Sequence, residues 1–68
     1  MTTDQLAARA NYTATQAHDA WKLGVLTASL FAEVTEGCLN ATKALRSGDE
    51  DEALRLLDEA ADLLEFAC

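Results

Sequence analysis

One stretch of the chain, AWKLGVLTASLFAEV at residues 20–34, carries only two charged side chains, Lys22 and Glu33. It is shorter than the roughly 20 apolar residues that a membrane-spanning helix needs, so we expect it to pack against other parts of a protein. When residues 14–46 are placed on one helix at about 100° per residue, the polar side chains fall on one narrow stripe: His18, Lys22, Ser29, Glu33, Glu36, Asn40 and Lys43. The apolar face therefore covers more than half of the helix, which predicts contact with more than one neighbouring helix.

The composition also indicates an all-helical protein. The chain has 68 residues, no proline and three glycines, and a chain this short can bury only a small core. Such small proteins usually gain stability from disulfides, a metal ion or self-association. Two cysteines and one histidine are too few for a disulfide scaffold or a zinc site. We therefore predict no metal and no cofactor, and self-association remains the expected source of stability.

A turn interrupts the helical pattern at residues 47–49. Gly48 suits the left-handed position just after a helix end, and Asp49 suits the N-cap of a following helix, with Glu52 three residues later as in a capping box. The sequence therefore predicts one helical domain built as a hairpin, with a long first helix at 14–46 and a second helix at 50–67.

The start of the first helix has two interpretations. Thr2 and Gln5, and again Thr13 and Gln16, have the spacing of a capping box. Residues 1–13 can thus be an N-terminal arm or short helix that precedes the long one, or the first helix can run without a break from about residue 3. The weak helix formers around Thr13 favour the break.

The unequal lengths of the two helices predict a homodimer. At 1.5 Å per residue the second helix is roughly 25 Å long and the first roughly 50 Å, so the second helix reaches back only to about residue 28. Residues 14–26 would then have no cover within the chain, and a second copy would complete a four-helix bundle. The residues expected at that dimer interface are Ala17, Trp21, Leu23, Gly24, Ala28 and Phe31.

The charge of the chain is unevenly distributed. The formal net charge is −7, and residues 49–68 account for all of it, because acids and bases balance in residues 1–48. No basic patch is present to displace the counterions of DNA or RNA, so direct nucleic-acid binding is not expected. An acidic helix face can also imitate a row of phosphates, which gives an alternative function as a nucleic-acid mimic that competes for a basic protein.

His18 allows a further alternative. The segment AHDAWKLG is similar to the helix motif of histidine-phosphotransfer domains, in which a histidine is followed by lysine and glycine. Here Lys22 and Gly24 stand four and six residues after His18, instead of three and four. The resemblance implies a phosphate acceptor at His18.

Some apolar residues interrupt the polar side of each expected helix. Val25 and Leu26 follow Lys22 on the first helix, and Phe66 lies beside acidic residues on the second. Exposed apolar residues with polar neighbours often mark protein interfaces. The predicted partner-binding residues are Lys22, Val25, Leu26, Asp58, Glu59, Asp62, Glu65 and Phe66.

These features favour a small non-enzymatic protein that binds another protein. No catalytic constellation is present, and the N-terminus lacks the basic start and apolar core of a signal peptide, which predicts a cytoplasmic location and no membrane partner. By size and charge the chain is similar to anti-activators, antitoxins and phage-encoded inhibitors of host or defence proteins. We therefore expect a stoichiometric inhibitor or modulator of a larger protein.

Overall fold

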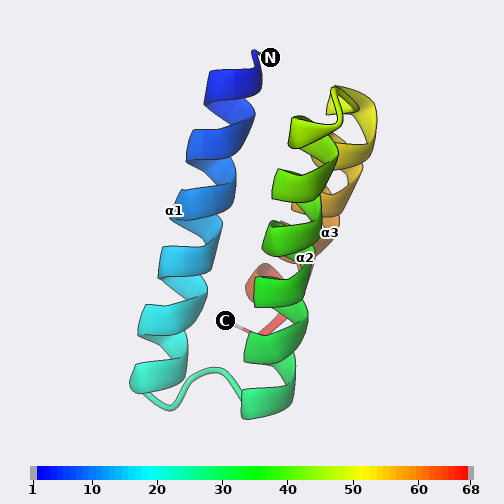
Figure 1. Cartoon of the computed structure of the whole chain (residues 1–68). Coiled ribbons are helices and arrows are strands. Elements are labelled where there is room, and N and C mark those ends of the chain that lie inside the picture. Colours follow the sequence, from blue (N-terminus) through cyan, green and yellow to red (C-terminus); the bar gives the residue numbers. More distant parts are fainter. Residues whose placement is uncertain (1, 68) are drawn as a thin grey trace.

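The computed structural model describes residues 2–67, which form three helices and no strands. Helix α1 spans Thr3–Lys22, α2 spans Ala28–Arg46 and α3 spans Glu50–Ala67. The three helices run alternately down, up and down in a bundle about 35 Å long (Figure 1). The prediction of an all-helical fold is confirmed. Within residues 2–67, no helix has the length and apolarity required to cross a bilayer.

The predicted long helix at 14–46 is wrong, because the chain turns at residues 23–27. Gly24 has a positive φ of 78°, and its N–H donates to the Trp21 carbonyl (3.0 Å). The Val25 N–H donates to the Ala20 carbonyl (2.9 Å). These two hydrogen bonds and the left-handed glycine are the Schellman motif, which ends a helix. The chain therefore forms a bundle of three helices instead of the predicted hairpin of two.

Helix α2 begins immediately after this turn. The Thr27 hydroxyl accepts a hydrogen bond from the Leu30 N–H (3.2 Å), and Thr27 has the extended backbone conformation of an N-cap residue. A helix end at Gly24 and a helix start at Thr27 leave only a short connection. Helix α1 consequently folds back along α2.

The predicted break before Thr13 is also wrong. The Gln5 N–H donates to the Thr2 hydroxyl (3.2 Å) and the Gln5 side chain accepts from the Thr2 N–H (3.0 Å), which completes a capping box. From this cap α1 continues without a break to Lys22. Thr13 is buried within the helix instead of starting one.

The turn between α2 and α3 repeats the Schellman motif. Gly48 has a φ of 80°, and the Gly48 and Asp49 N–H groups donate to the Leu45 and Ala44 carbonyls. The Asp49 carboxylate accepts from the Glu52 N–H (3.1 Å), so it caps α3 as expected. The Glu52 side chain does not complete a capping box, because its carboxylate binds Arg55.

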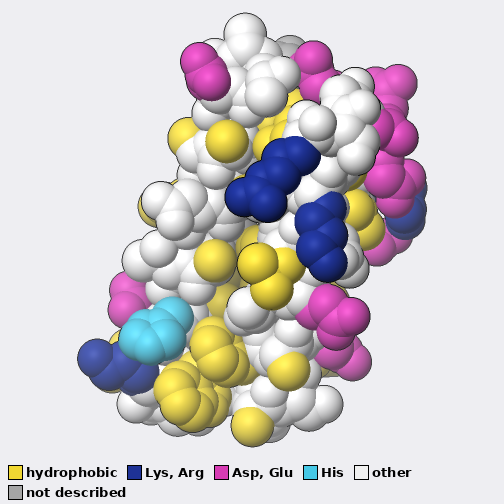
Figure 2. Space-filling model, viewed as in Figure 1, with side chains coloured by type: hydrophobic (Ala, Val, Ile, Leu, Met, Phe, Trp, Pro, Cys, Tyr) yellow, Lys and Arg dark blue, Asp and Glu magenta, His cyan; other side chains and the backbone are white. Residues whose placement is uncertain are grey.

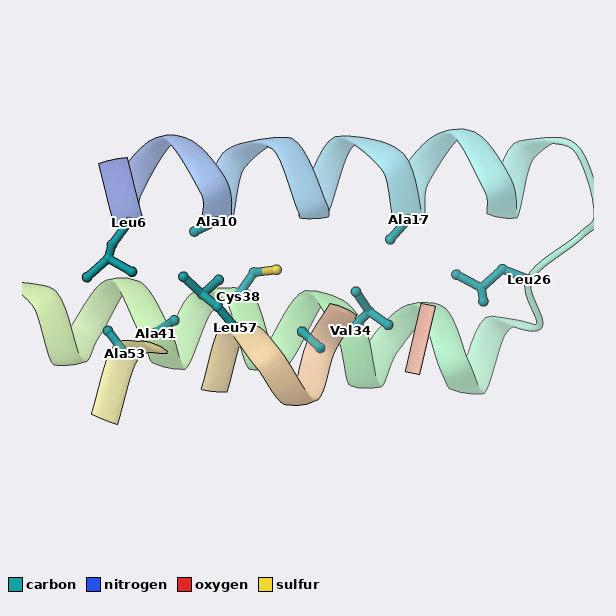
Figure 3. Packing of buried hydrophobic residues seen from close by; sticks show 10 residues of the cluster. Leu6, Ala10, Ala17, Leu26, Val34, Cys38, Ala41, Ala53 and Leu57 are labelled. Carbon is teal, nitrogen blue, oxygen red and sulfur yellow. The ribbon is translucent and has the colours of Figure 1, made fainter. Parts of the chain in front are cut away.

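The core lies along the line where the three helices meet and consists mostly of small residues. Leu6, Val34 and Leu57 are its largest fully buried side chains. Figure 3 shows side chains from α1 pointing towards those of α2 and α3, and Leu26 pointing inwards from the turn. The other buried hydrophobic residues are Ala10, Ala17, Cys38, Ala41, Ala53 and Ala60.

Helix α1 provides the cover that the two-helix interpretation lacked. It packs against both other helices, and the Arg9 guanidinium forms an ion pair with the Asp58 carboxylate of α3 (2.7 Å). The argument for a homodimer relied on an uncovered arm at residues 14–26, and α1, which contains most of that segment, packs against α2 and α3 within the same chain. A homodimer stays a prediction, without that argument for it.

Candidate protein-binding surface

Exposed apolar side chains concentrate at the end of the bundle that carries the α1–α2 turn, which we call the loop end. Leu23 is 80% exposed and Val25 is 51% exposed. Both flank Gly24, so the hydrogen bonds of the Schellman motif hold their backbone in place. These two side chains are therefore presented to solvent by an ordered turn.

A groove between α1 and α3 opens beside this turn. Its volume is about 650 Å³, which is within the range of protein binding pockets. Leu23 and Val25 form one part of its wall. The remaining lining residues are Thr13, Gln16, Asp19 and Ala20 of α1, and Ala61, Leu64 and Glu65 of α3. We call this feature the α1–α3 groove.

Two carboxylates and the C-terminal ends of two helices lie near the α1–α3 groove. Helices α1 and α3 run in the same direction and both end here (Figure 1), and a helix C-terminus carries a partial negative charge. Asp19 and Glu65 add carboxylates to the groove. Lys22 lies in the last turn of α1, whereas the last turn of α3 has no basic residue. The acids at the end of α3 thus have no compensating charge on their own helix turn.

Two arginines form ion pairs with three acidic residues of α3. Arg55 contacts the carboxylates of Glu52 and Glu59. The hydrogen bonds that Arg55 donates to the Glu52 carboxylate, together with the negative charges of Glu52 and Glu59, raise the pKa of Arg55. Asp58 is paired with Arg9. Asp62 and Glu65, by contrast, make no ion pair with any residue in the described part of the chain. Figure 2 shows the acidic side chains that follow the α3 edge of the molecule.

The predicted partner-binding residues occupy different environments. Lys22 and Val25 are exposed, but Leu26 is only 3% exposed. The expectation that Leu26 lies on a water-facing line is wrong, because the turn at Gly24 directs this side chain into the core. Phe66 is 87% exposed and lies next to Glu59 and Asp62 on α3, as the helical pattern predicts.

The six residues expected at a dimer interface are also separated by the turn. Ala17 is buried inside the chain, Gly24 forms the turn and Ala28 is exposed at the start of α2. Leu23 is part of the α1–α3 groove. Trp21 and Phe31 contact each other across α1 and α2. The six therefore do not form one continuous surface.

Trp21, Phe31 and His18 form an aromatic cluster on the α1–α2 side of the bundle. The rings of Trp21 and Phe31 are stacked, with centroids 4.9 Å apart and planes at 7°. The His18 ring centroid lies 6.1 Å from each, and its Nδ1 is 4.0 Å from the Asp19 carboxylate. Figure 2 shows hydrophobic side chains gathered beside the histidine at this end. The phosphotransfer role of His18 stays a prediction.

Cys38 has the environment of a structural residue. It is buried on α2, and this burial raises the pKa of its thiol, which lowers the reactivity of a cysteine. A smaller cavity of about 260 Å³ lies beside it between α1 and α2. The Thr35 hydroxyl that lines this cavity is buried without a hydrogen-bond partner in the described part of the chain.

Sequence reasoning missed most of the residues that line the groove. Val25 and Glu65 were expected to bind a partner, but Asp19, Ala20 and Leu64 were not. Their proximity depends on the side-by-side packing of α1 and α3, which no local pattern contains. The available signal was Gly24 followed by Thr27, a helix stop followed by a helix start.

Comparison of the chain with protein-family models, with curated proteins and with solved structures finds no match in any of the three.

Proposed function

We propose that this protein binds another protein through its loop end and acts as a stoichiometric inhibitor or modulator of that partner. The observation that carries the proposal is the exposure of Leu23 and Val25 on an ordered turn beside the α1–α3 groove. Apolar residues with polar neighbours often mark interfaces, and here Gln16, Asp19 and Glu65 surround them.

The exposed apolar side chains at the loop end can supply enough binding energy to anchor a partner. Burial of one large apolar side chain contributes about 1.5–3 kcal/mol, and a few such residues carry most of the energy of an interface. Leu23 and Val25 can supply two of these anchors. Phe66 can supply a third at the edge of the surface, although it lies outside the groove.

A binding role is favoured over catalysis by the chemistry of the groove. Its polar lining residues are Thr13, Gln16, Asp19 and Glu65. Nucleophilic catalysis requires an activated nucleophile next to a base, and His18 and Cys38 lie on the α1–α2 side instead. We therefore propose a non-enzymatic function.

The experiment is affinity capture from a lysate of the source organism, followed by quantitative mass spectrometry. The parent chain should enrich one protein at a fixed molar ratio. The double variant Leu23→Ser/Val25→Ser should lose it, because both apolar anchors are removed. The matched control is Leu39→Ser, which changes an exposed leucine on α2 and should retain the partner.

The same capture distinguishes the alternative of nucleic-acid mimicry. The observation that favours mimicry is that Asp49 and α3 together account for the whole net charge. Neutralising Asp58, Glu59, Asp62 and Glu65 should abolish the binding of a mimic together with its salt dependence. Under the proposed function this change mainly slows association. Capture that survives Leu23→Ser/Val25→Ser but is lost with the four acids would replace the proposal by mimicry.

A further inference from the structure

We infer that the partner segment is a basic amphipathic helix that lies in the α1–α3 groove as a fourth helix of the bundle. This inference rests on the proposed function and adds the chemistry of the partner. It follows from the shape of the groove, from its charge and from the charges of the chain's own helices.

The shape of the groove suits a helix. Thr13, Gln16 and Ala20 are spaced three and four residues apart, so they line one side of α1 over two turns. Ala61 and Leu64 are three residues apart and line the facing side of α3. The small side chains of Ala20 and Ala61 let another helix approach both walls closely, as in helix-in-groove recognition.

An extended peptide has no comparable site here. Recognition of an extended strand uses the unpaired backbone groups of a sheet edge, and the described part of the chain contains no strand. The backbone groups of α1 and α3 are paired within their own helices. Side-chain packing is therefore the means by which the groove can hold a partner, and a helix with one apolar stripe supplies it.

The charge of the groove requires basic residues beside that stripe. The carboxylates of Asp19 and Glu65 line the groove, one on each wall, and no basic residue among the described residues 2–67 lines it. The C-terminal ends of α1 and α3 add partial negative charge at the same place. Lysine or arginine residues on both sides of the apolar stripe would pair with Asp19 on one wall and Glu65 on the other.

Within residues 2–67, a second copy of this chain has no helix with the positive charge that the groove requires. Acidic and basic residues are equal in number in α1 and in α2, while α3 has a large excess of acids. None of the three helices is basic, so none complements the groove. Charge complementarity therefore indicates a different protein as the occupant.

The experiment measures the binding of fluorescently labelled peptides by anisotropy. The first peptide has about 18 residues, with leucine at helical spacing and lysine elsewhere, long enough to span the groove. The second peptide replaces every lysine by glutamate. The third has the composition of the first in an order that removes the apolar stripe. The lysine peptide should bind in a one-to-one complex, and the other two should not.

Pairs of variants and matched controls test whether the peptide binds in the α1–α3 groove. Leu23→Ser/Val25→Ser should weaken binding of the lysine peptide by about tenfold or more, whereas Leu39→Ser should not. Asp19→Asn/Glu65→Gln should weaken it by about fivefold at low salt. Its matched control, Glu50→Gln/Asp51→Asn, changes the net charge equally at the opposite end of α3 and should change binding less than about twofold.

Three results would overturn the inference. The first is equal weakening by the two acidic pairs, because the attraction would then be a general effect of net charge. The second is binding that Leu23→Ser/Val25→Ser does not change. The third is a set of peptides that do not bind, and if a lysate partner is still lost with Leu23→Ser/Val25→Ser, the proposed function keeps its support. Selective binding of the lysine peptide without any lysate partner would support the helix site in the groove and contradict the proposed function.

Discussion

Single residues contribute very unequally to this protein, because few large side chains are fully buried. Leu57 has no exposed surface, whereas Leu39 is exposed on α2. Leu57→Ala should lower the free energy of unfolding by about 2–5 kcal/mol through lost burial and a new cavity. Leu39→Ala should change it by less than about 0.5 kcal/mol. Urea denaturation followed by circular dichroism measures both changes. Similar losses of stability for the two variants would contradict the placement of Leu57 in the core and of Leu39 on the surface.

A substitution of Trp21 distinguishes packing within the chain from packing against a second copy. Its ring is 43% exposed and stacks on Phe31. Trp21→Ala should therefore cost about 1–2 kcal/mol, close to the value of a stacked pair together with partial burial. A double-mutant cycle with Phe31→Ala should show that the two losses are coupled. A cost of 3–5 kcal/mol, typical of a fully buried aromatic ring, would contradict this placement.

At the scale of helices, the pairing of α1 with α3 creates the candidate site, and one ion pair tests it. Arg9 and Asp58 are partly exposed, and exposed pairs contribute about 0.2–1 kcal/mol. The variants Arg9→Gln and Asp58→Asn, alone and combined, should give a coupling energy in that range. A coupling energy of zero at low salt would count against the Arg9–Asp58 ion pair.

The same scale shows what the sequence could predict. Gly48 and Gly24 adopt the same Schellman motif, but only Gly48 was recognised as a helix end. Gly48 lies between Ser47 and Asp49, and this polar setting marks a turn. Gly24 lies between Leu23 and Val25, and such apolar neighbours continue the helical pattern. The all-helical class and the α2–α3 turn could therefore be predicted, and the third helix was missed.

The error at Gly24 also explains the mixed result for the candidate site. A helical projection places Val25 and Leu26 on the same side only if the helix is continuous. The turn separates them, so Val25 is exposed and Leu26 is buried. Phe66 lies on a helix whose bounds were predicted, and its exposure followed from the pattern. Asp19 and Glu65 became neighbours of one groove only through tertiary packing.

For the whole molecule, the three helices bury a common core without a second copy. We therefore expect the melting temperature to be independent of protein concentration over a hundredfold range in the micromolar region, because mass action affects stability only when folding requires association. Circular dichroism at several path lengths measures this. A melting temperature that rises with concentration would show that a dimer contributes to folding.

The central claim is that the chain turns at Gly24, because the third helix, the exposure of Leu23 and Val25 and the α1–α3 groove all depend on that turn. The most direct measurement is the change in unfolding free energy of Gly24→Ala. In the left-handed conformation at Gly24, alanine should destabilise the protein by about 1–2 kcal/mol, as Gly48→Ala should at the equivalent turn. In a continuous helix the same substitution would stabilise it by roughly 1 kcal/mol, and that opposite sign would contradict the account.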